Sequence, residues 1–135
     1  MISFTISIQC VACPRPRVTR FGVYYPKTYT QFKKDCVALL KSLKLSFGKS
    51  MFLHVDYTIV IKRTSTLTVK KHGKERCFKS TRPDLDNYVK SINDCMQEAG
   101  MIEDDSQIVS FTAKKMYGAV KEEPVIEISI TPIKQ

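Results

Sequence analysis

The chain has 135 residues, of which 43% are hydrophobic, so it is predicted to fold as one globular domain over residues 1–135 rather than remain disordered. Lysine and arginine number 22 against 13 acidic residues, and the resulting net charge of +9 favours an anionic partner such as nucleic acid. No apolar run reaches the ~18 residues of a membrane span and the N-terminus lacks a signal peptide's basic region, so we expect a cytoplasmic protein with no membrane partner.

The first half of the chain predicts a strand, a basic loop, a helix and a second strand. Residues 2–8 alternate apolar and polar side chains, as a half-buried strand does. Residues 13–20 contain two prolines and three arginines, which predict an extended basic loop. Residues 30–45 predict a helix, and residues 52–62 alternate again as a strand. The apolar stripe expected on the helix consists of Phe32, Cys36, Leu39, Leu40 and Leu43. The buried row expected on the second strand consists of Leu53, Val55, Tyr57, Ile59 and Ile61.

Residues 63–82 form a strongly basic connection. They hold eight basic side chains and one acidic side chain, Glu75. Such a run is often only a solvated surface, but this excess favours contact with a polyanion. The Lys71-His72-Gly73-Lys74 segment predicts the tip of a hairpin arm.

A second helix is predicted to begin after Pro83 and Asp84 and to end at Gly100. Strands are predicted over residues 108–116 and 125–130. The order is therefore β-α-β-α-β-β, with the basic arm before the second helix. This order favours an α+β fold, in which two main helices pack on one face of a mixed β-sheet.

Two groups of carboxylates flank the second helix. Asp84 could serve only as a helix N-cap, but Asp86 follows two residues later, and both side chains could face one cation. Lys90 could be a solvated lysine, an i,i+4 partner of Asp86, or a group that neutralises charge on a phosphate. Asp104 and Asp105 could be turn residues; as a metal ligand we favour Asp105, which lies nearer the following strand. Ligands that are all oxygen suit Mg²⁺ or Mn²⁺.

The length of the second helix separates these carboxylates. A helix from Leu85 to Ala99 is about 22 Å long, so Asp105 lies far from Asp84 unless the chain turns back. We therefore predict an antiparallel dimer in which Asp105 of one subunit lies beside Asp84 and Asp86 of the other.

The Arg82-Pro83-Asp84-Leu85-Asp86-Asn87 segment, Lys90 and the Asp104-Asp105-Ser106-Gln107 segment together resemble the RusA family of Holliday-junction resolvases. Pro14-Arg15-Pro16-Arg17 with Tyr25-Pro26 resembles the N-terminal region of its phage-type members. The resemblance implies a homodimeric endodeoxyribonuclease that needs Mg²⁺ or Mn²⁺ and makes paired nicks in four-way DNA junctions during recombination and repair. It assigns Asp84, Asp86 and Asp105 as catalytic, metal-binding aspartates and Lys90 as a catalytic lysine.

Basic residues around this site are expected to contact DNA. The candidates are Arg15, Arg17, Arg20, Lys27, Lys70, Lys71, Lys74, Arg76, Lys79, Arg82, Lys114 and Lys115. Two alternatives remain open: a nuclease for flaps or other branched DNA, and a non-catalytic nucleic-acid-binding module whose carboxylates are only caps and turns. Cys10 and Cys13 form a lone CxxC pair, but no second pair of zinc ligands follows at close spacing and the five cysteines have no framework spacing, so we expect free thiols.

Overall fold

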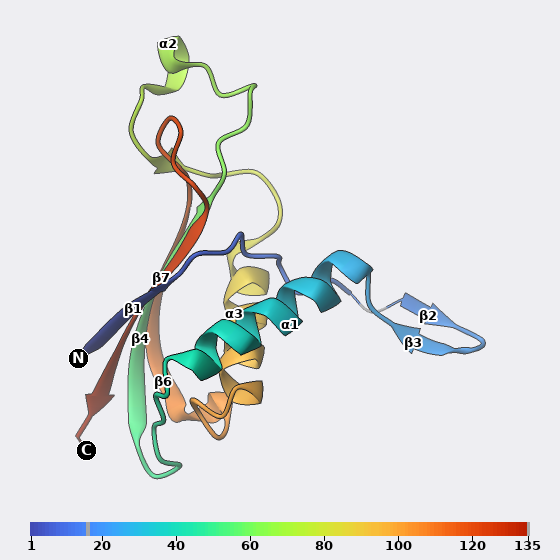
Figure 1. The fold of residues 1–135 in the computed structure, drawn as a ribbon, viewed down its shortest axis with the longest axis vertical. Coiled ribbons are helices and arrows are strands. Elements are labelled where there is room, and N and C mark those ends of the chain that lie inside the picture. Colours follow the sequence, from blue (N-terminus) through green and yellow to red (C-terminus); the bar gives the residue numbers. More distant parts are fainter. Residues whose placement is uncertain (16, 135) are drawn as a thin grey trace.

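A five-stranded mixed sheet forms the centre of the molecule, which is a computed structural model describing residues 1–15 and 17–134 (Figure 1). Across the sheet the strands are β1 (Ile2–Ile6), β7 (Val125–Ile133), β4 (Phe52–Ile61), β6 (Ile108–Tyr117) and β5 (Cys77–Phe78). Only the β4–β6 pair is parallel; the other pairs are antiparallel. The chain between parallel neighbours must cross the face of the sheet, and a helix makes that crossing here.

Two long helices, α1 (Lys27–Ser42) and α3 (Leu85–Glu98), lie on the same face of this sheet (Figure 1). They cover the row of β4 side chains predicted to be buried, none of which is more than 7% exposed. The predicted α+β class and the placement of both helices on one face are thus confirmed. None of the helices in the described ranges is long and apolar enough to cross a membrane.

The predicted bounds and stripe of the first helix were partly wrong. The helix begins at Lys27, three residues early, because Pro26 takes the N-cap position with a φ of −58° and the chain turns helical directly after it. Phe32, Cys36 and Leu40 are buried as expected. Leu39 and Leu43, however, are 41% and 37% exposed, because the face that contacts the sheet and α3 is narrower than the apolar stripe.

The predicted basic loop near residue 20 is a small hairpin. Strands β2 (Arg17–Thr19) and β3 (Gly22–Tyr24) pair antiparallel as a separate ribbon that projects away from the body (Figure 1). Pro16 and the side chain of Arg17, a predicted DNA contact, lie outside the described residues.

The hairpin arm predicted around residues 71–74 was wrong. The short helix α2 (Val69–His72) occupies this segment, and Gly73 ends it with a φ of +75°, which favours glycine. Arg63 ties the segment to the body by donating hydrogen bonds to the carbonyls of Gly73, Glu75 and Gly118 at 2.7, 2.8 and 3.1 Å.

Candidate active site

A cleft of about 940 Å³ opens at the N-terminal end of α3. Asp84 takes the N-cap position of this helix, but its side chain makes no capping hydrogen bond with the described residues. The capping role that could have explained Asp84 is therefore not filled, and its carboxylate is exposed at the cleft together with that of Asp86. The lining residues are Ala12, Cys13, Pro14, Arg15, Tyr25, Arg82, Pro83, Asp84, Asp86, Asn87 and Lys90.

One wall of the cleft comes from the N-terminal segment. The backbone N–H of Cys13 donates to the carbonyl of Asn87 at 2.9 Å, which joins this segment to the first turn of α3. Arg15 and Tyr25, further along this segment, line the same cleft as the two carboxylates. With Arg82 and Lys90 also lining the cleft, three cationic groups and two carboxylates share one opening, which suits a phosphate held beside a cation.

Two lysines hold the loop that leads into Asp84, which contributes Arg82 and Pro83 to the lining of the cleft. The ammonium group of Lys79 donates to the carbonyls of Thr81 and Arg82 at 3.0 and 2.6 Å and to the Thr81 hydroxyl at 2.9 Å. The ammonium group of Lys115 donates to the carbonyls of Thr81 and Pro83 at 2.9 and 2.8 Å. The carbonyls of three successive residues before Asp84 are thus bound by two side chains, one just after β5 and one on β6. Burial of Lys79, and then the nearby charge of Lys115, lower the pKa of the Lys79 ammonium.

Lys90 has a different ionic partner from the one considered from the sequence. Its ammonium lies 4.0 Å from a carboxylate oxygen of Asp94, one turn further along α3. No ion pair between Lys90 and Asp86 is present among the described residues. The side chain of Lys90 is 61% exposed and lines the cleft, so it is accessible to a bound phosphate.

Asp105 does not line this cleft. It begins the 3-10 turn η1 (Asp105–Gln107), and its backbone N–H donates to Gln97 near the other end of α3 at 3.3 Å. Asp86 and Gln97 are 11 residues apart along the helix, or about 16 Å. Within residues 1–15 and 17–134 no three metal-ligating side chains come together. Asp105 therefore does not form a three-ligand cluster with Asp84 and Asp86 in the described part of the chain, although the nearby charge of Lys90, which lines the cleft, acts on its carboxyl.

The neighbouring carboxylate gives Asp105 an unusual environment. Asp104 caps η1 by accepting a hydrogen bond from the Ser106 N–H at 2.9 Å. A hydrogen bond with Asp104, followed by burial and the nearby charges of Asp104 and Asp94, raises the pKa of Asp105. The Ser106 backbone hydrogen bond, followed by the contact with Asp105, lowers the pKa of Asp104. Of the two, Asp105 is the carboxyl whose ionisation is opposed by its surroundings.

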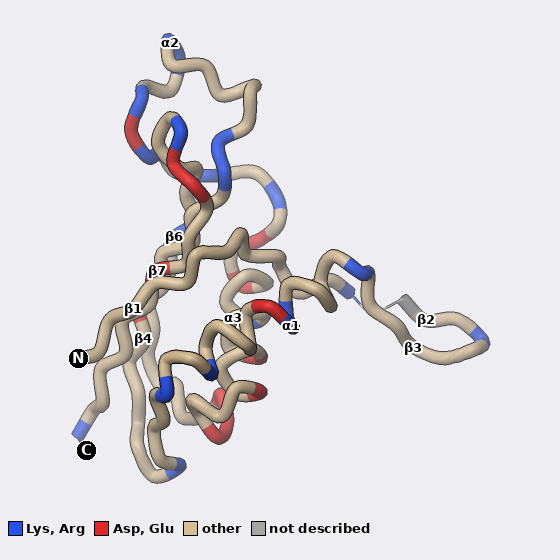
Figure 2. The backbone as a smooth tube through the Cα atoms, viewed as in Figure 1, with Lys and Arg blue, Asp and Glu red and all other residues tan. Residues whose placement is uncertain are grey.

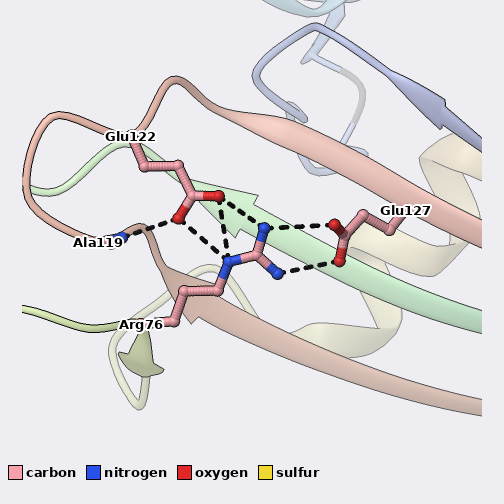
Figure 3. Close-up of polar contacts among 4 residues, drawn as sticks. All are labelled: Arg76, Ala119, Glu122 and Glu127. Carbon is pink, nitrogen blue, oxygen red and sulfur yellow. Dashed lines mark hydrogen bonds and ion pairs between the residues drawn. The ribbon is translucent and has the colours of Figure 1, made fainter.

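Three of the predicted DNA contacts, Arg76, Lys79 and Lys115, have partners within the protein. The guanidinium of Arg76 lies between Glu122 and Glu127 and donates to both carboxylates at 2.6 to 3.2 Å (Figure 3). Lys79 is only 7% exposed. Charge counting along the sequence missed these roles. The partners of Arg76 and Lys115 come from other segments, and those of Lys79 are carbonyl and hydroxyl groups two and three residues further along the chain.

The other basic candidates lie at the surface. Figure 2 shows lysines and arginines on the β2–β3 hairpin and around α2, whereas acidic residues gather along α3 and the turn that follows it. The candidates that are exposed are Arg15, Arg20, Lys27, Lys70, Lys71, Lys74, Arg82 and Lys114. All five cysteines are free thiols, as expected.

Comparison with known proteins places this site in a family. Residues 7–131 match endodeoxyribonuclease RusA. The chain belongs to the RusA endodeoxyribonuclease family. This confirms the prediction of an endodeoxyribonuclease of the junction-resolving type, and members of this family depend on a divalent metal ion.

Two relatives illustrate the match. The chain is 32% identical over 142 residues to the uncharacterized protein YqaN of Bacillus subtilis (strain 168), which covers 98% of this chain and 96% of that protein. It is 45% identical over 56 residues to the crossover junction endodeoxyribonuclease rusA of Lactococcus phage r1t, which covers 42% of this chain and 40% of that protein.

Proposed function

We propose that this chain, as one RusA-like domain over residues 1–135, cleaves phosphodiester bonds in four-way DNA junctions by metal-assisted hydrolysis. The observation that carries the proposal is the cleft at the start of α3, where the carboxylates of Asp84 and Asp86 meet the cationic side chains of Arg15, Arg82 and Lys90. Carboxylates alone would repel DNA, and cations alone would bind it without cleaving it. The combination suits phosphoryl chemistry.

The residues present fit a hard divalent cation. Asp84 and Asp86 offer only oxygen ligands, and neither is engaged in an ion pair among the described residues. Mg²⁺ typically takes one or two protein carboxylates and completes its shell with water and phosphate oxygens, so we propose Mg²⁺, with Mn²⁺ as a substitute. When bound, such an ion lowers the pKa of a coordinated water and neutralises charge on the phosphate.

The remaining side chains of the cleft act on the DNA. Arg15 and Arg82 supply guanidinium groups that can bind a phosphate through two hydrogen bonds and so fix the position of the strand. Lys90 carries a charge on a flexible stem at the same opening, where it stabilises the charge that develops on the phosphate as the bond breaks. None of these contacts depends on the bases, which fits selection of DNA by shape rather than by sequence.

Asp105 is proposed to complete the site from a second subunit. The outer edge of β6 over residues 108–114 has no strand partner in the described part of the chain, because β5 covers only Met116 and Tyr117. Val109 and Phe111 on this stretch are 56% and 53% exposed. An unpaired edge with exposed apolar side chains favours pairing with another strand.

The register of that pairing supports a shared site. Two β6 edges paired antiparallel about residue 111 would place η1 of one subunit, which directly precedes β6, near the end of β6 in the other subunit, where Tyr117 lies. The hydroxyl of Tyr117 bonds to Thr81 at 2.9 Å, in the loop that leads into Asp84. A symmetric dimer of this kind would bring Asp105 toward the cleft of its partner and would provide two sites for paired nicks.

Cleavage of a synthetic four-way junction tests the function, with linear duplex, flap and single-stranded DNA as controls and with Mg²⁺, Mn²⁺ or EDTA. We expect metal-dependent paired nicks in the junction. The Asp84→Asn variant should lose at least 100-fold in cleavage rate while it still binds the junction. Cleavage of the flap in preference to the junction would redirect the proposal to other branched DNA. Wild-type activity in Asp84→Asn would refute the assignment of the site.

Mixing two inactive variants tests the shared site. Asp84→Asn and Asp105→Asn proteins are combined, and heterodimers are isolated by two affinity tags. If each site draws residues from both subunits, a heterodimer contains one intact site and one with both changes, so it recovers nicking at one strand. Confirmed heterodimers that remain inactive would exclude sharing and would place both aspartates in the site of one chain.

A further inference from the structure

The β2–β3 hairpin is held in shape by its own turn and has an apolar tip. Thr19 accepts a hydrogen bond from the Phe21 N–H at 3.2 Å and donates to the Gly22 carbonyl at 3.3 Å. Gly22 adopts a φ of +127°, a backbone conformation that favours glycine. These contacts fix the direction in which the residue at the tip, Phe21, leaves the turn.

The side chains of this hairpin are far more exposed than apolar groups of this size usually are. Phe21 is 87% exposed, Val18 is 77% exposed and Val23 is 61% exposed. The guanidinium of Arg20 lies 5.0 Å from the centre of the Phe21 ring and leaves the other face of the ring open. Projecting apolar groups of this kind mark a binding surface, because water around them is released when a partner covers them.

Charge identifies the class of partner. The chain has no acidic residue before Asp35, whereas Arg15, Arg20 and Lys27 lie on or beside the hairpin. A second copy of the same hairpin would meet it with like charge, which disfavours self-association. A cationic ribbon with an exposed aromatic tip matches a nucleic acid, whose phosphates bind arginine and whose bases stack on aromatic rings.

The position of the hairpin links it to the cleft. Arg15, just before β2, and Tyr25, just after β3, both line the opening that contains Asp84. From Tyr24 to Phe21 the ribbon extends about 10 Å beyond this edge. A strand whose phosphate lies in the cleft therefore has its next few nucleotides within reach of the tip.

We propose that Phe21 stacks on an unpaired base at the branch point of the DNA, while Arg20 binds a neighbouring phosphate. This inference rests on the proposed function and adds a source of selectivity to it. In an intact duplex both faces of every base are covered by neighbouring bases, so the Phe21 ring has no base face on which to stack. At a branch point a base face can be uncovered, and stacking on it is worth roughly tenfold or more in affinity.

Binding measurements with the metal removed test this proposal independently of cleavage. Anisotropy in EDTA gives the affinity of wild type, Phe21→Ala and Phe21→Trp for a four-way junction and for linear duplex of the same length. Phe21→Ala should bind the junction about tenfold more weakly and the duplex within about twofold of wild type. Phe21→Trp should retain junction binding. In wild type, 2-aminopurine at the branch point should be quenched, and Phe21→Ala should restore its emission.

Phe78→Ala serves as the matched control, because Phe78 is 76% exposed but lies on β5 rather than on the hairpin. Its affinity for the junction should equal that of wild type. The role of the tip would be overturned if Phe21→Ala and Phe78→Ala lost the same affinity for the junction. It would also be overturned if Phe21→Ala lost the same affinity for the junction and for the duplex. A change of oligomeric state in Phe21→Ala would also overturn it and would make the hairpin a contact between subunits.

Failure of this inference is distinguishable from failure of the proposed function. If wild type nicks the junction and Phe21→Ala keeps full junction affinity, the function stands and the hairpin proposal is wrong. If wild type neither binds nor cleaves branched DNA in preference to duplex, both proposals are wrong.

Discussion

Replacing Lys79 by methionine tests whether this residue orders the active-site loop or binds DNA. Methionine preserves most of the length and the apolar stem of lysine but removes the ammonium group. That group makes three hydrogen bonds to Thr81 and Arg82 at 2.6 to 3.0 Å. Their loss releases one of the three side chains that hold the loop before Asp84, and Lys115 and Tyr117 remain bound to it.

The size of the effect follows from the burial of Lys79. Hydrogen bonds to a charged group contribute about 1.5–3 kcal/mol each, but their sum is reduced by the cost of burying the ammonium of a residue that is 7% exposed. We expect Lys79→Met to lower the free energy of unfolding by about 2 kcal/mol, or the Tm by roughly 6–10 °C. A shift of Asp84 by about 1 Å would lower the cleavage rate by 10- to 100-fold.

Urea unfolding, junction affinity in EDTA and single-turnover nicking are measured together. If Lys79 orders the loop, stability and cleavage rate fall while the affinity for the junction stays within about twofold of wild type. Lys74→Met is the matched control, because Lys74 is an exposed lysine in the same segment. It should weaken DNA binding without loss of stability. Weaker DNA binding by Lys79→Met, with unchanged stability and unchanged cleavage at saturating DNA, would refute this reasoning.

Further predictions concern charge and backbone conformation. Glu122→Gln should lower the free energy of unfolding by about 1–2 kcal/mol at pH 7, because Arg76 binds the carboxylate and lowers the Glu122 pKa below its usual 4.5. This stabilisation is present above pH 4.5 and disappears as the pH falls through the lower folded-state pKa of Glu122. The urea unfolding curves of wild type and Glu122→Gln should therefore converge in acid. A difference in stability that stays constant with pH would contradict this prediction. Lys70→Ala and Lys71→Ala should each reduce the slope of log affinity against log salt by about 1, and an unchanged slope would remove that lysine from the DNA surface. Gly100→Ala should lower the free energy of unfolding by about 1 kcal/mol, because a φ of +79° strains alanine although the space around its Cβ is open. Thermal unfolding measures this change, and unchanged stability would contradict the prediction.

The alternation of side chains predicted the sheet well. The five apolar side chains of β4 repeat every second residue, and burying them requires one covered face whatever the rest of the chain does. The buried stripe of α1 was less predictable. Leu39 and Leu43 continue the apolar spacing, but they lie outside the face of the helix that the sheet and α3 cover. The residues of the cleft were predictable in part, since Asp84, Asp86 and Lys90 lie within two turns of one helix.

Pairings between distant segments were not predictable. Arg76 looked like a free surface charge in the basic segment, but the fold places it beside Glu122 and Glu127, which are 46 and 51 residues away. Lys79 looked equally free, and only the turn of the loop after it brings the carbonyl of Arg82 to its ammonium. Likewise, a pair of prolines and several arginines predicts an extended loop, and only pairing across the turn makes it a projecting ribbon.

The sequence by itself determined which residues could carry the chemistry of this protein: a basic chain with carboxylates two residues apart at a helix start, and a further pair of carboxylates beyond the end of a long helix. These properties depend on residue type, spacing and the rise of a helix, all of which are local. The tertiary structure decided which charges are available. It binds Arg76 and Lys79 internally, leaves Asp84 uncapped at an open cleft and extends Phe21 into solvent. The pairing of Arg76 depends on segments far apart in the chain, and the contacts of Lys79 depend on how the loop after it turns; local spacing encodes neither.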